Sequence, residues 1–208
     1  MTILLSDPRV GAIPVRESGE PLVALGPGLG PALARVRESL AVRLHRAAAL
    51  LPAGVGLRVV EGHRSEADQR LIIARYAGEV AAAHPGVDAV ELEILTSRFV
   101  APIAVAPHVA GAAVDLTLVD ADGVELDLGT PIDATPEESD DACYFAATGI
   151  PAAARAHRDL LAEVLGAVGL VNYPTEWWHW SYGDRYWALM TGAPAALYGP
   201  VADREAVA

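Results

Sequence analysis

The amphipathic stretch from residue 31 to residue 51 is the feature that most constrains the fold, because its apolar face has to be buried against the rest of the chain. Apolar residues recur along it at helical spacing, and most charged residues fall on the other side. A proline and a glycine then end the pattern. Residues 65–83 and 151–168 predict two further helices, the first with Ser65 as its N-cap.

Short β-prone runs separate these helices. Residues 56–60 and 114–119 predict two strands, and residues 120–123 predict a tight hairpin turn into residues 124–126. A further β-prone run, rich in aromatic residues, covers 175–182. Because helices and antiparallel-looking strands are unevenly mixed along the chain, their order predicts an α+β fold.

Three other segments have weaker patterns. Residues 1–30 are rich in glycine and proline and predict an extended N-terminal arm with turns. Residues 87–107 are ambiguous. Residues 127–150 predict a long acidic loop, and a loop of that length in a compact domain more often has a function than not. The length and the absence of internal repeats predict a single domain over residues 1–208.

The charge composition excludes several partners and chemistries. The chain has 27 acidic and 15 basic residues and a formal net charge of −12, and every basic residue is an arginine. This acidity argues against nucleic acid and against anionic membrane surfaces as partners. The absence of lysine excludes a Schiff-base lysine and a Walker-type phosphate loop.

The cysteine content and the start of the chain bear on its location. One cysteine, Cys143, excludes an internal disulfide framework and a Cys-rich zinc site. The first residues include no basic leader followed by the roughly 7–15 apolar residues of a signal peptide. No stretch approaches the roughly 18 apolar residues of a membrane-spanning helix. We therefore expect a cytoplasmic protein, and a homo-oligomer stays open.

Two of the six histidines lie in unusual surroundings, and the first is His108. It stands among small residues, and Asp115 follows seven positions later at the start of a predicted strand. Imidazole and carboxylate ligands suit zinc, and small neighbours permit the close approach that a metal site needs. Taken alone, this spacing more often belongs to a loop histidine and a solvated aspartate.

The second is His179, in the run Glu-Trp-Trp-His at 176–179. His108, Asp115 and His179 would supply the three protein ligands of a catalytic zinc, which keeps one position open for water. Glu176 could then take the proton of that water and pass it to a leaving amine. Residues i and i+3 share a face on a helix, whereas a strand here needs a bulge or bend. The alternative is an aromatic core strand with an incidental glutamate and histidine.

Arg64 follows the predicted strand at 56–60, where a side chain often projects into a site. Its guanidinium could stabilise the oxyanion of a tetrahedral intermediate. The alternative for a lone arginine is a surface ion pair with Glu61 or Glu66. His63 is a weak alternative metal ligand.

Four ordered segments carry a family resemblance. Residues 106–115 match Ser-x-His-x-x-Gly-x-Ala-x-Asp, with Ala106 in place of the serine. Residues 61–64 match an acidic residue followed by Gly-Tyr-Arg, residues 128–133 match Met-Gly-Thr-x-Phe-Asp, and residues 176–179 match Glu-x-x-His. Together these segments resemble the D-Ala-D-Ala metallopeptidases, in particular the vancomycin-resistance-type D-alanyl-D-alanine dipeptidases.

The resemblance implies a fold and a cofactor. The fold is a single α+β domain with a central antiparallel sheet flanked by helices, shared with the hedgehog signalling domain. The cofactor is one zinc ion per chain, with His108, Asp115 and His179 as its ligands.

The resemblance also implies further roles. Glu176 is the general base and acid, Arg64 stabilises the carbonyl oxygen, and Glu61 orients Arg64 or binds substrate. The departures at Ala106, His63 and Ile132 bear on substrate preference and leave the metal ligands and the base intact.

The activity that the resemblance implies is hydrolysis of the small dipeptide D-Ala-D-Ala by metal-bound water, in cell-wall peptide turnover or precursor depletion. The acidic segment 127–141 could direct carboxylates toward the ammonium end of this substrate, although a solvated loop is the alternative. Two other functions stay open, a D,D-carboxypeptidase acting on muramyl peptides and a non-catalytic zinc-stabilised binding module. The intact Glu176 argues against the second, because a structural zinc needs no adjacent base.

Overall fold

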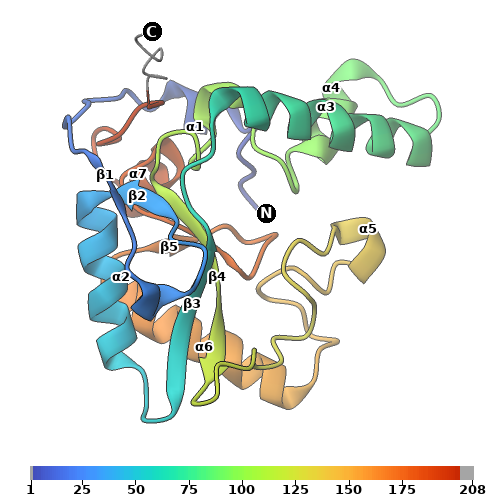
Figure 1. Ribbon diagram of the computed structural model, residues 1–208. Helices are drawn as coiled ribbons and strands as arrows, with labels where there is room; N and C mark the ends of the chain where they lie inside the picture. The colour runs from blue at the N-terminus through green and yellow to red at the C-terminus, as the bar shows by residue number, and fades with distance from the viewer. Residues whose placement is uncertain (1, 202–208) are drawn as a thin grey trace, which may run out of the picture.

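The computed structural model describes residues 2–201, so residue 1 and residues 202–208 of the expected domain lie outside the described part. Helices and strands alternate irregularly along the chain (Figure 1). The helices are α1 (Pro8–Ala12), α2 (Glu38–Leu50), α3 (Glu66–Ala83), α4 (Ala89–Thr96), α5 (Pro136–Ser139), α6 (Ala152–Ala167) and α7 (Arg185–Thr191), with 3-10 turns η1 (Pro27–Leu29) and η2 (Ile103–Val105). The strands are β1 (Leu22–Ala24), β2 (Arg35–Arg37), β3 (Val55–Glu61), β4 (Ala113–Asp120), β5 (Val171–Asn172) and β6 (His179–Ser181).

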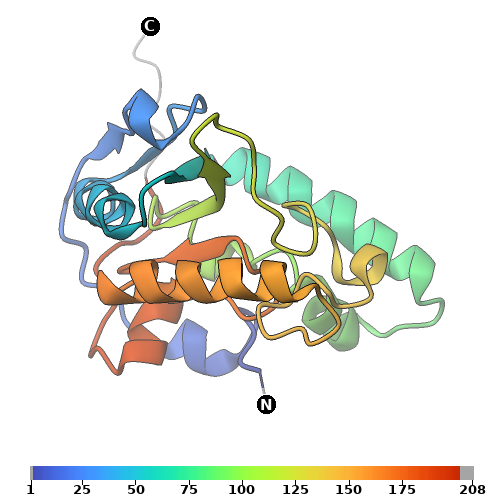
Figure 2. The same cartoon turned by 90° about the horizontal axis from the view of Figure 1, so that it is seen from below.

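The central element is a four-stranded antiparallel sheet of order β3-β4-β6-β5. Its core face carries alternate residues of β3 and β4, among them Val59, Leu116 and Leu118, and these pack with residues of α2 and α6 in the main hydrophobic cluster. Seen from below, α6 passes in front of the sheet and α2 is viewed almost end-on (Figure 2). Burial of these apolar side chains is the main force that holds the two helices on this face.

Two differences from the sequence-based expectations occur near the N-terminus. The helix expected over 31–51 begins only at Glu38, because Arg35–Arg37 form β2 and pair with β1. This pairing joins residues 11 to 15 positions apart in the chain, and local periodicity does not report it. The expected extended arm is also partly helical, since Asp7 caps the short helix α1 with its side chain.

The other expected elements occur close to their predicted positions. The Ser65 hydroxyl accepts a hydrogen bond from the Asp68 amide and caps α3. The ambiguous segment 87–107 contains α4 and η2, and the acidic loop contains only the single turn of α5. The turn at 120–123 is present, but residues 124–126 form a single bridge to β4 rather than a strand.

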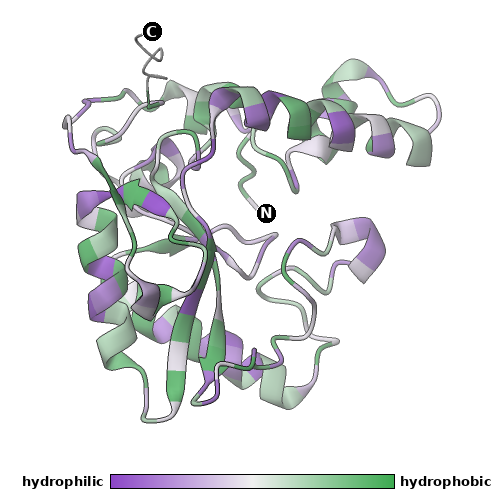
Figure 3. Cartoon of the chain, in the orientation of Figure 1, coloured by the Kyte–Doolittle hydropathy of each residue, from purple (hydrophilic) through white to green (hydrophobic). Residues whose placement is uncertain are grey.

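The helix α3, its partner α4 and the segment with α5 project to the same side of the sheet (Figure 1). Hydrophilic and hydrophobic residues intermingle along α2 and α3, as expected of helices with one face in solvent (Figure 3). Tyr76 of α3 donates a hydrogen bond to Glu137 of α5 at 2.8 Å, which ties the two segments together. Within residues 2–201, no helix is long and apolar enough to cross a membrane.

Candidate active site

Three chemically active side chains form one row across the sheet. In the strand register Glu61 of β3 lies opposite Asp115 of β4, and Asp115 lies opposite His179 of β6. Cross-strand partners point to the same face of a sheet, so the row faces away from the hydrophobic core. A β-bulge makes this possible: the register shifts between Val59 and Glu61, and the extra residue, Val60, turns Glu61 onto the face of Asp115.

His108 reaches the same point from the loop that precedes β4. Its ring nitrogen Nδ1 lies 2.7 Å from the Gly62 carbonyl oxygen, which can only accept a hydrogen bond, so Nδ1 carries the proton. In the neutral ring Nε2 then carries no proton, and this nitrogen faces Asp115 and His179. The loop turns at Gly111, whose φ of 65° suits glycine.

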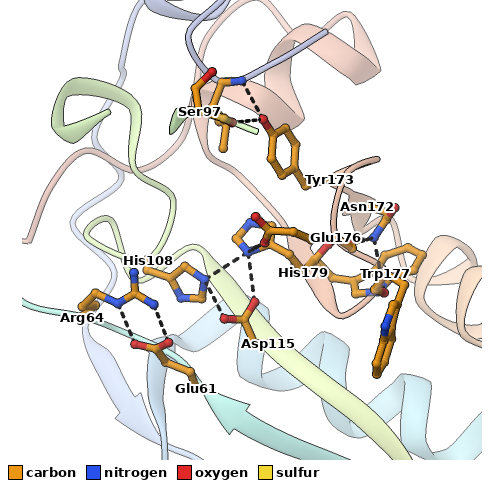
Figure 4. Close-up of polar contacts among 12 residues, drawn as sticks. Glu61, Arg64, Ser97, His108, Asp115, Asn172, Tyr173, Glu176, Trp177 and His179 are labelled. Carbon is orange, nitrogen blue, oxygen red and sulfur yellow. Dashed lines mark hydrogen bonds and ion pairs between the residues drawn. The ribbon is translucent and has the colours of Figure 1, made fainter. Parts of the chain in front are cut away.

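The donor atoms of the three residues form a small triangle (Figure 4). His108 Nε2 lies 3.1 Å from His179 Nδ1 and 3.3 Å from Asp115 Oδ2, and His179 Nδ1 lies 3.0 Å from Asp115 Oδ1. Ligands at zinc bond lengths of about 2.0–2.1 Å in a tetrahedron lie about 3.3–3.4 Å apart. All three residues are buried. The size of the triangle and the nature of its donors fit a zinc ion with one open position.

The charges around this triangle also suit a cation. Burial alone would raise the pKa of Asp115, but the two imidazoles outweigh burial and hold that pKa well below its ordinary value. Burial lowers the pKa of His179 and so keeps it neutral, the state in which an imidazole binds metal.

Glu176 lies in a tight turn directly before β6, so neither a helix nor a bulged strand brings it close to His179. The Glu176 amide donates to Tyr173, the His179 amide donates to the Glu176 carbonyl at 3.3 Å, and Glu176 Oε2 comes to 3.8 Å from His179 Nδ1. The Asn172 side chain donates to the carbonyls of both Glu176 and His179 and closes the turn (Figure 4). Burial, followed by repulsion from Asp115, raises the pKa of Glu176 well above its ordinary value.

Arg64 is an internal residue of the site and not a surface arginine. Its Nε and Nη2 donate to the two carboxylate oxygens of Glu61 at 2.7 and 2.5 Å, and its Nη1 donates to Gln69 at 2.8 Å. Sequence reasoning did not single out Gln69, which is fully enclosed and also donates to the Ala101 carbonyl. Within the described part of the chain, three of the five N–H groups of the Arg64 side chain are thus engaged, and two are left to donate to a ligand.

A cavity of about 420 Å³ brings these groups together. Glu61, Arg64, the metal-binding triangle, Glu176 and Asp133 all line it. Asp133 is accessible to solvent and forms no hydrogen bond or ion pair with any described residue. Partial loss of solvent, followed by repulsion from Asp115 and Glu61, raises its pKa to about 6. The sequence indicated Asp133 only as one of several acidic residues in a loop and as the end of a motif.

The three departures from the family motifs lie in different places. Ala106 lines the cavity, so a serine there would face it. Ile132 packs at the edge of the main hydrophobic cluster. His63 is not among the described residues that line the cavity, and it is not part of the metal-binding triangle.

Comparisons with known proteins identify relatives of this chain. A family model described as D-Ala-D-Ala dipeptidase matches residues 32–192. A D-alanyl-D-alanine dipeptidase of Synechocystis is 35% identical over 96 residues, which cover 42% of this chain and 38% of that protein. One from Escherichia coli is 38% identical over 72 residues, 35% of either chain. The matched regions thus span little more than a third of these relatives.

Two solved structures share the fold. One is a variant of the vancomycin-resistance D,D-pentapeptidase VanY from a VanB-type cassette, in complex with Zn(II). It has a TM-score of 0.51 and 18% identity, over 88% of this chain and 90% of that one. VanYB in complex with D-alanine-D-alanine gives a TM-score of 0.51 and 19% identity, over 83% and 84%.

The expected α+β fold with a central antiparallel sheet is therefore confirmed. The family match covers most of the chain and includes all four motif segments. On this evidence the chain belongs to the D-Ala-D-Ala dipeptidase family of metallopeptidases.

Proposed function

We propose that this protein is a zinc-dependent dipeptidase that hydrolyses D-alanyl-D-alanine to two D-alanines. The observation that carries this proposal is the pairing, in one cavity, of a metal-binding triangle with the unpartnered carboxylate of Asp133. A free dipeptide has an ammonium group beside its scissile carbonyl, and a longer peptide has none at that place. An unpaired carboxylate in the cavity wall suits that ammonium.

The residues proposed to hold zinc are His108, Asp115 and His179. Bound there, zinc would polarise the substrate carbonyl and lower the pKa of a water from 15.7 to about 7. The Gly62 carbonyl holds the proton of His108 on Nδ1 and so keeps Nε2 available as a ligand.

Glu176 is proposed to move the proton. Its carboxylate is buried and close to His179, and its raised pKa matches the needs of a group that accepts a proton from water and then donates it to the leaving amine nitrogen. The turn closed by Asn172 fixes the carboxylate at this position before substrate binds.

Arg64 is proposed to bind the carbonyl oxygen as negative charge develops on it. Glu61 and Gln69 hold the guanidinium on two sides, so little reorganisation is needed when the substrate arrives. Glu61 therefore acts through Arg64, as one of the two roles expected for it.

One observation favours a second candidate, a D,D-carboxypeptidase. Gln69, Ile72, Tyr76 and Glu79 of α3 all line the cavity, so the cavity follows this helix for about 15 Å. An extended dipeptide spans only about 7 Å. The additional length could hold the preceding residues of a muramyl peptide.

The test measures D-alanine release by the purified, zinc-loaded protein from four substrates: D-Ala-D-Ala, N-acetyl-D-Ala-D-Ala, L-Ala-L-Ala and a muramyl pentapeptide. We expect rapid release from the free dipeptide, and little from the acetylated or L,L forms. The Asp133→Asn variant should raise KM for the free dipeptide only. Release from the pentapeptide alone would establish the second candidate, and a zinc-loaded protein inactive on all four would leave a binding module. The cytoplasmic location and the role in the cell wall stay predictions.

A further inference from the structure

Trp177 connects the two parts of the proposed site. It belongs to the turn that carries Glu176 and His179, and it is fully enclosed by protein. Its indole Nε1 donates to the Thr130 hydroxyl at 2.8 Å, and its backbone amide donates to the Cys143 carbonyl at 3.1 Å. Both acceptors lie in the loop that carries Asp133. Hydrogen bonds therefore join the turn that carries the base to the loop that carries the proposed ammonium site.

A buried arginine of α6 also binds the loop that carries Asp133. Arg158 of α6 is completely enclosed, and it forms no ion pair with any described residue. Its Nε donates to the Leu128 carbonyl at 2.7 Å, and its two terminal nitrogens donate to the carbonyls of Ala142 and Tyr144 at 2.8 and 2.6 Å. A cation buried in this way has to be compensated by such acceptors, so Leu128, Ala142 and Tyr144 of the loop are fixed against α6.

The chain between Thr130 and Asp133 has little freedom. Gly129 has a φ of 94°, and a Cβ there would lie 2.9 Å from Ile150, so the chain enters through a position that only glycine fits. Pro131 restricts its own φ, and Asp133 has a φ of 63°. The position of Thr130 therefore determines the position of Asp133.

We propose that Thr130 is a positioning residue that sets the separation between Asp133 and the turn of Glu176 and His179, and thereby restricts hydrolysis to dipeptides. This inference rests on the proposed function. A tripeptide places its ammonium group one residue, about 3.3–3.6 Å, further from the scissile carbonyl than a dipeptide does. A carboxylate held at one fixed distance from the turn of Glu176 and His179 pairs with the ammonium group of a dipeptide. It leaves the ammonium group of a tripeptide unmatched.

The test compares Thr130→Val with Thr130→Ser. Valine keeps the shape of threonine and removes the acceptor for Trp177, whereas serine keeps the hydroxyl. For D-Ala-D-Ala we expect T130V to lower kcat/KM about three- to tenfold, mainly through KM, because one neutral hydrogen bond is lost. Its preference for D-Ala-D-Ala over D-Ala-D-Ala-D-Ala should fall. T130S should resemble the wild type, and zinc content should be equal in all three proteins.

Two further measurements separate positioning from general stability. In an Asp133→Asn background, T130V should have no further effect on KM, because the group that it positions is already lost. Amide hydrogen exchange in residues 128–135 should be faster in T130V than in T130S. A wild type that releases no D-alanine would overturn the proposed function. An active wild type whose substrate preference T130V leaves unchanged would overturn the role of Thr130 alone.

Discussion

Asp115 on β4 and His179 on β6 lie directly opposite each other in the strand register, with Oδ1 and Nδ1 3.0 Å apart. Two of the three candidate metal ligands thus have their separation set by backbone pairing. The third, His108, comes from a loop and is held by the Gly62 carbonyl at the end of β3. Three neighbouring strands therefore define the site before any ion binds, which is the preorganisation that precise catalytic geometry requires.

Replacing Glu176 with glutamine should abolish turnover and preserve the metal site. The amide cannot accept the proton, and loss of general acid–base catalysis lowers kcat by about 10²–10⁴. Metal analysis of the purified variant should still give one zinc per chain, because Glu176 is outside the ligand triangle. Full activity in a zinc-loaded Glu176→Gln protein would contradict the proposed role.

Removing the metal should abolish activity and lower thermal stability together. A ligand at one hundred times its Kd, bound only by the folded state, adds about 2.7 kcal/mol to the free energy of unfolding. Dialysis against a chelator should therefore lower Tm, and added Zn²⁺ should restore both Tm and activity. His179→Ala should show no shift of Tm with zinc, whereas an equal shift in that variant would place the ion elsewhere.

Replacing Arg64 with lysine should lower kcat while leaving zinc content unchanged. An ammonium cannot make the two-pronged contact with Glu61 and also donate to Gln69, so the oxyanion donors lose their fixed position. Loss of one such donor costs about 10²–10³ in kcat. Arg75→Lys is the matched control, because Arg75 lines the same cavity but is mostly exposed. Equal losses in both variants would argue against a specific role for Arg64.

The buried Asp184 should make the protein less stable as pH rises from 4 to 6. Burial raises its pKa from 3.8 to about 6, so in this range the folded state holds a proton that the unfolded state has released. The contribution of Asp184 to the free energy of unfolding is fully present below pH 4 and is lost as the pH rises through 6. The pKa shift from 3.8 to about 6 corresponds to a loss of about 3 kcal/mol, at 1.36 kcal/mol per pKa unit.

Urea unfolding of the wild type and of Asp184→Asn at pH 4, 5, 6 and 7 tests this. Asparagine keeps the acceptor that caps α7 through the Trp187 amide and cannot ionise. The stability of the wild type relative to the variant should fall over this range. A constant difference would show that Asp184 titrates at its ordinary pKa in the folded protein.

Much of the fold follows from local signals in the sequence. Ser65 and the residues after it specify α3 through a cap and a helical pattern, and the alternation in residues 114–119 specifies β4. The start of α2 was wrong by seven residues because Arg35–Arg37 pair with a strand formed much earlier in the chain. Propensity describes neighbours in sequence, and this pairing depends on distant ones.

The candidate site, too, could be predicted only where the sequence has a local pattern. The spacing of the motifs identified His108, Asp115, Glu176 and His179, and the structure brings these four residues together. Gln69 and Asn172 could not be found in this way, because their roles consist of hydrogen bonds to groups brought close by the fold. Thr130 lies in a motif segment, but its contact with Trp177 joins residues 47 positions apart and follows only from the fold.

Because of the extra residue in β3, spacing along the chain no longer tells which face of the sheet a side chain is on, although a sequence motif assumes that it does. Distance counted along the chain says that Val59 and Glu61 should share a face, yet the bulge places them on opposite faces. A homologue with one residue fewer at this point and an uninterrupted strand would assemble the same row of side chains. Pattern searches for distant members of such a family should therefore tolerate a one-residue deletion ahead of the arginine segment, or they will discard chains whose sheets present identical chemistry.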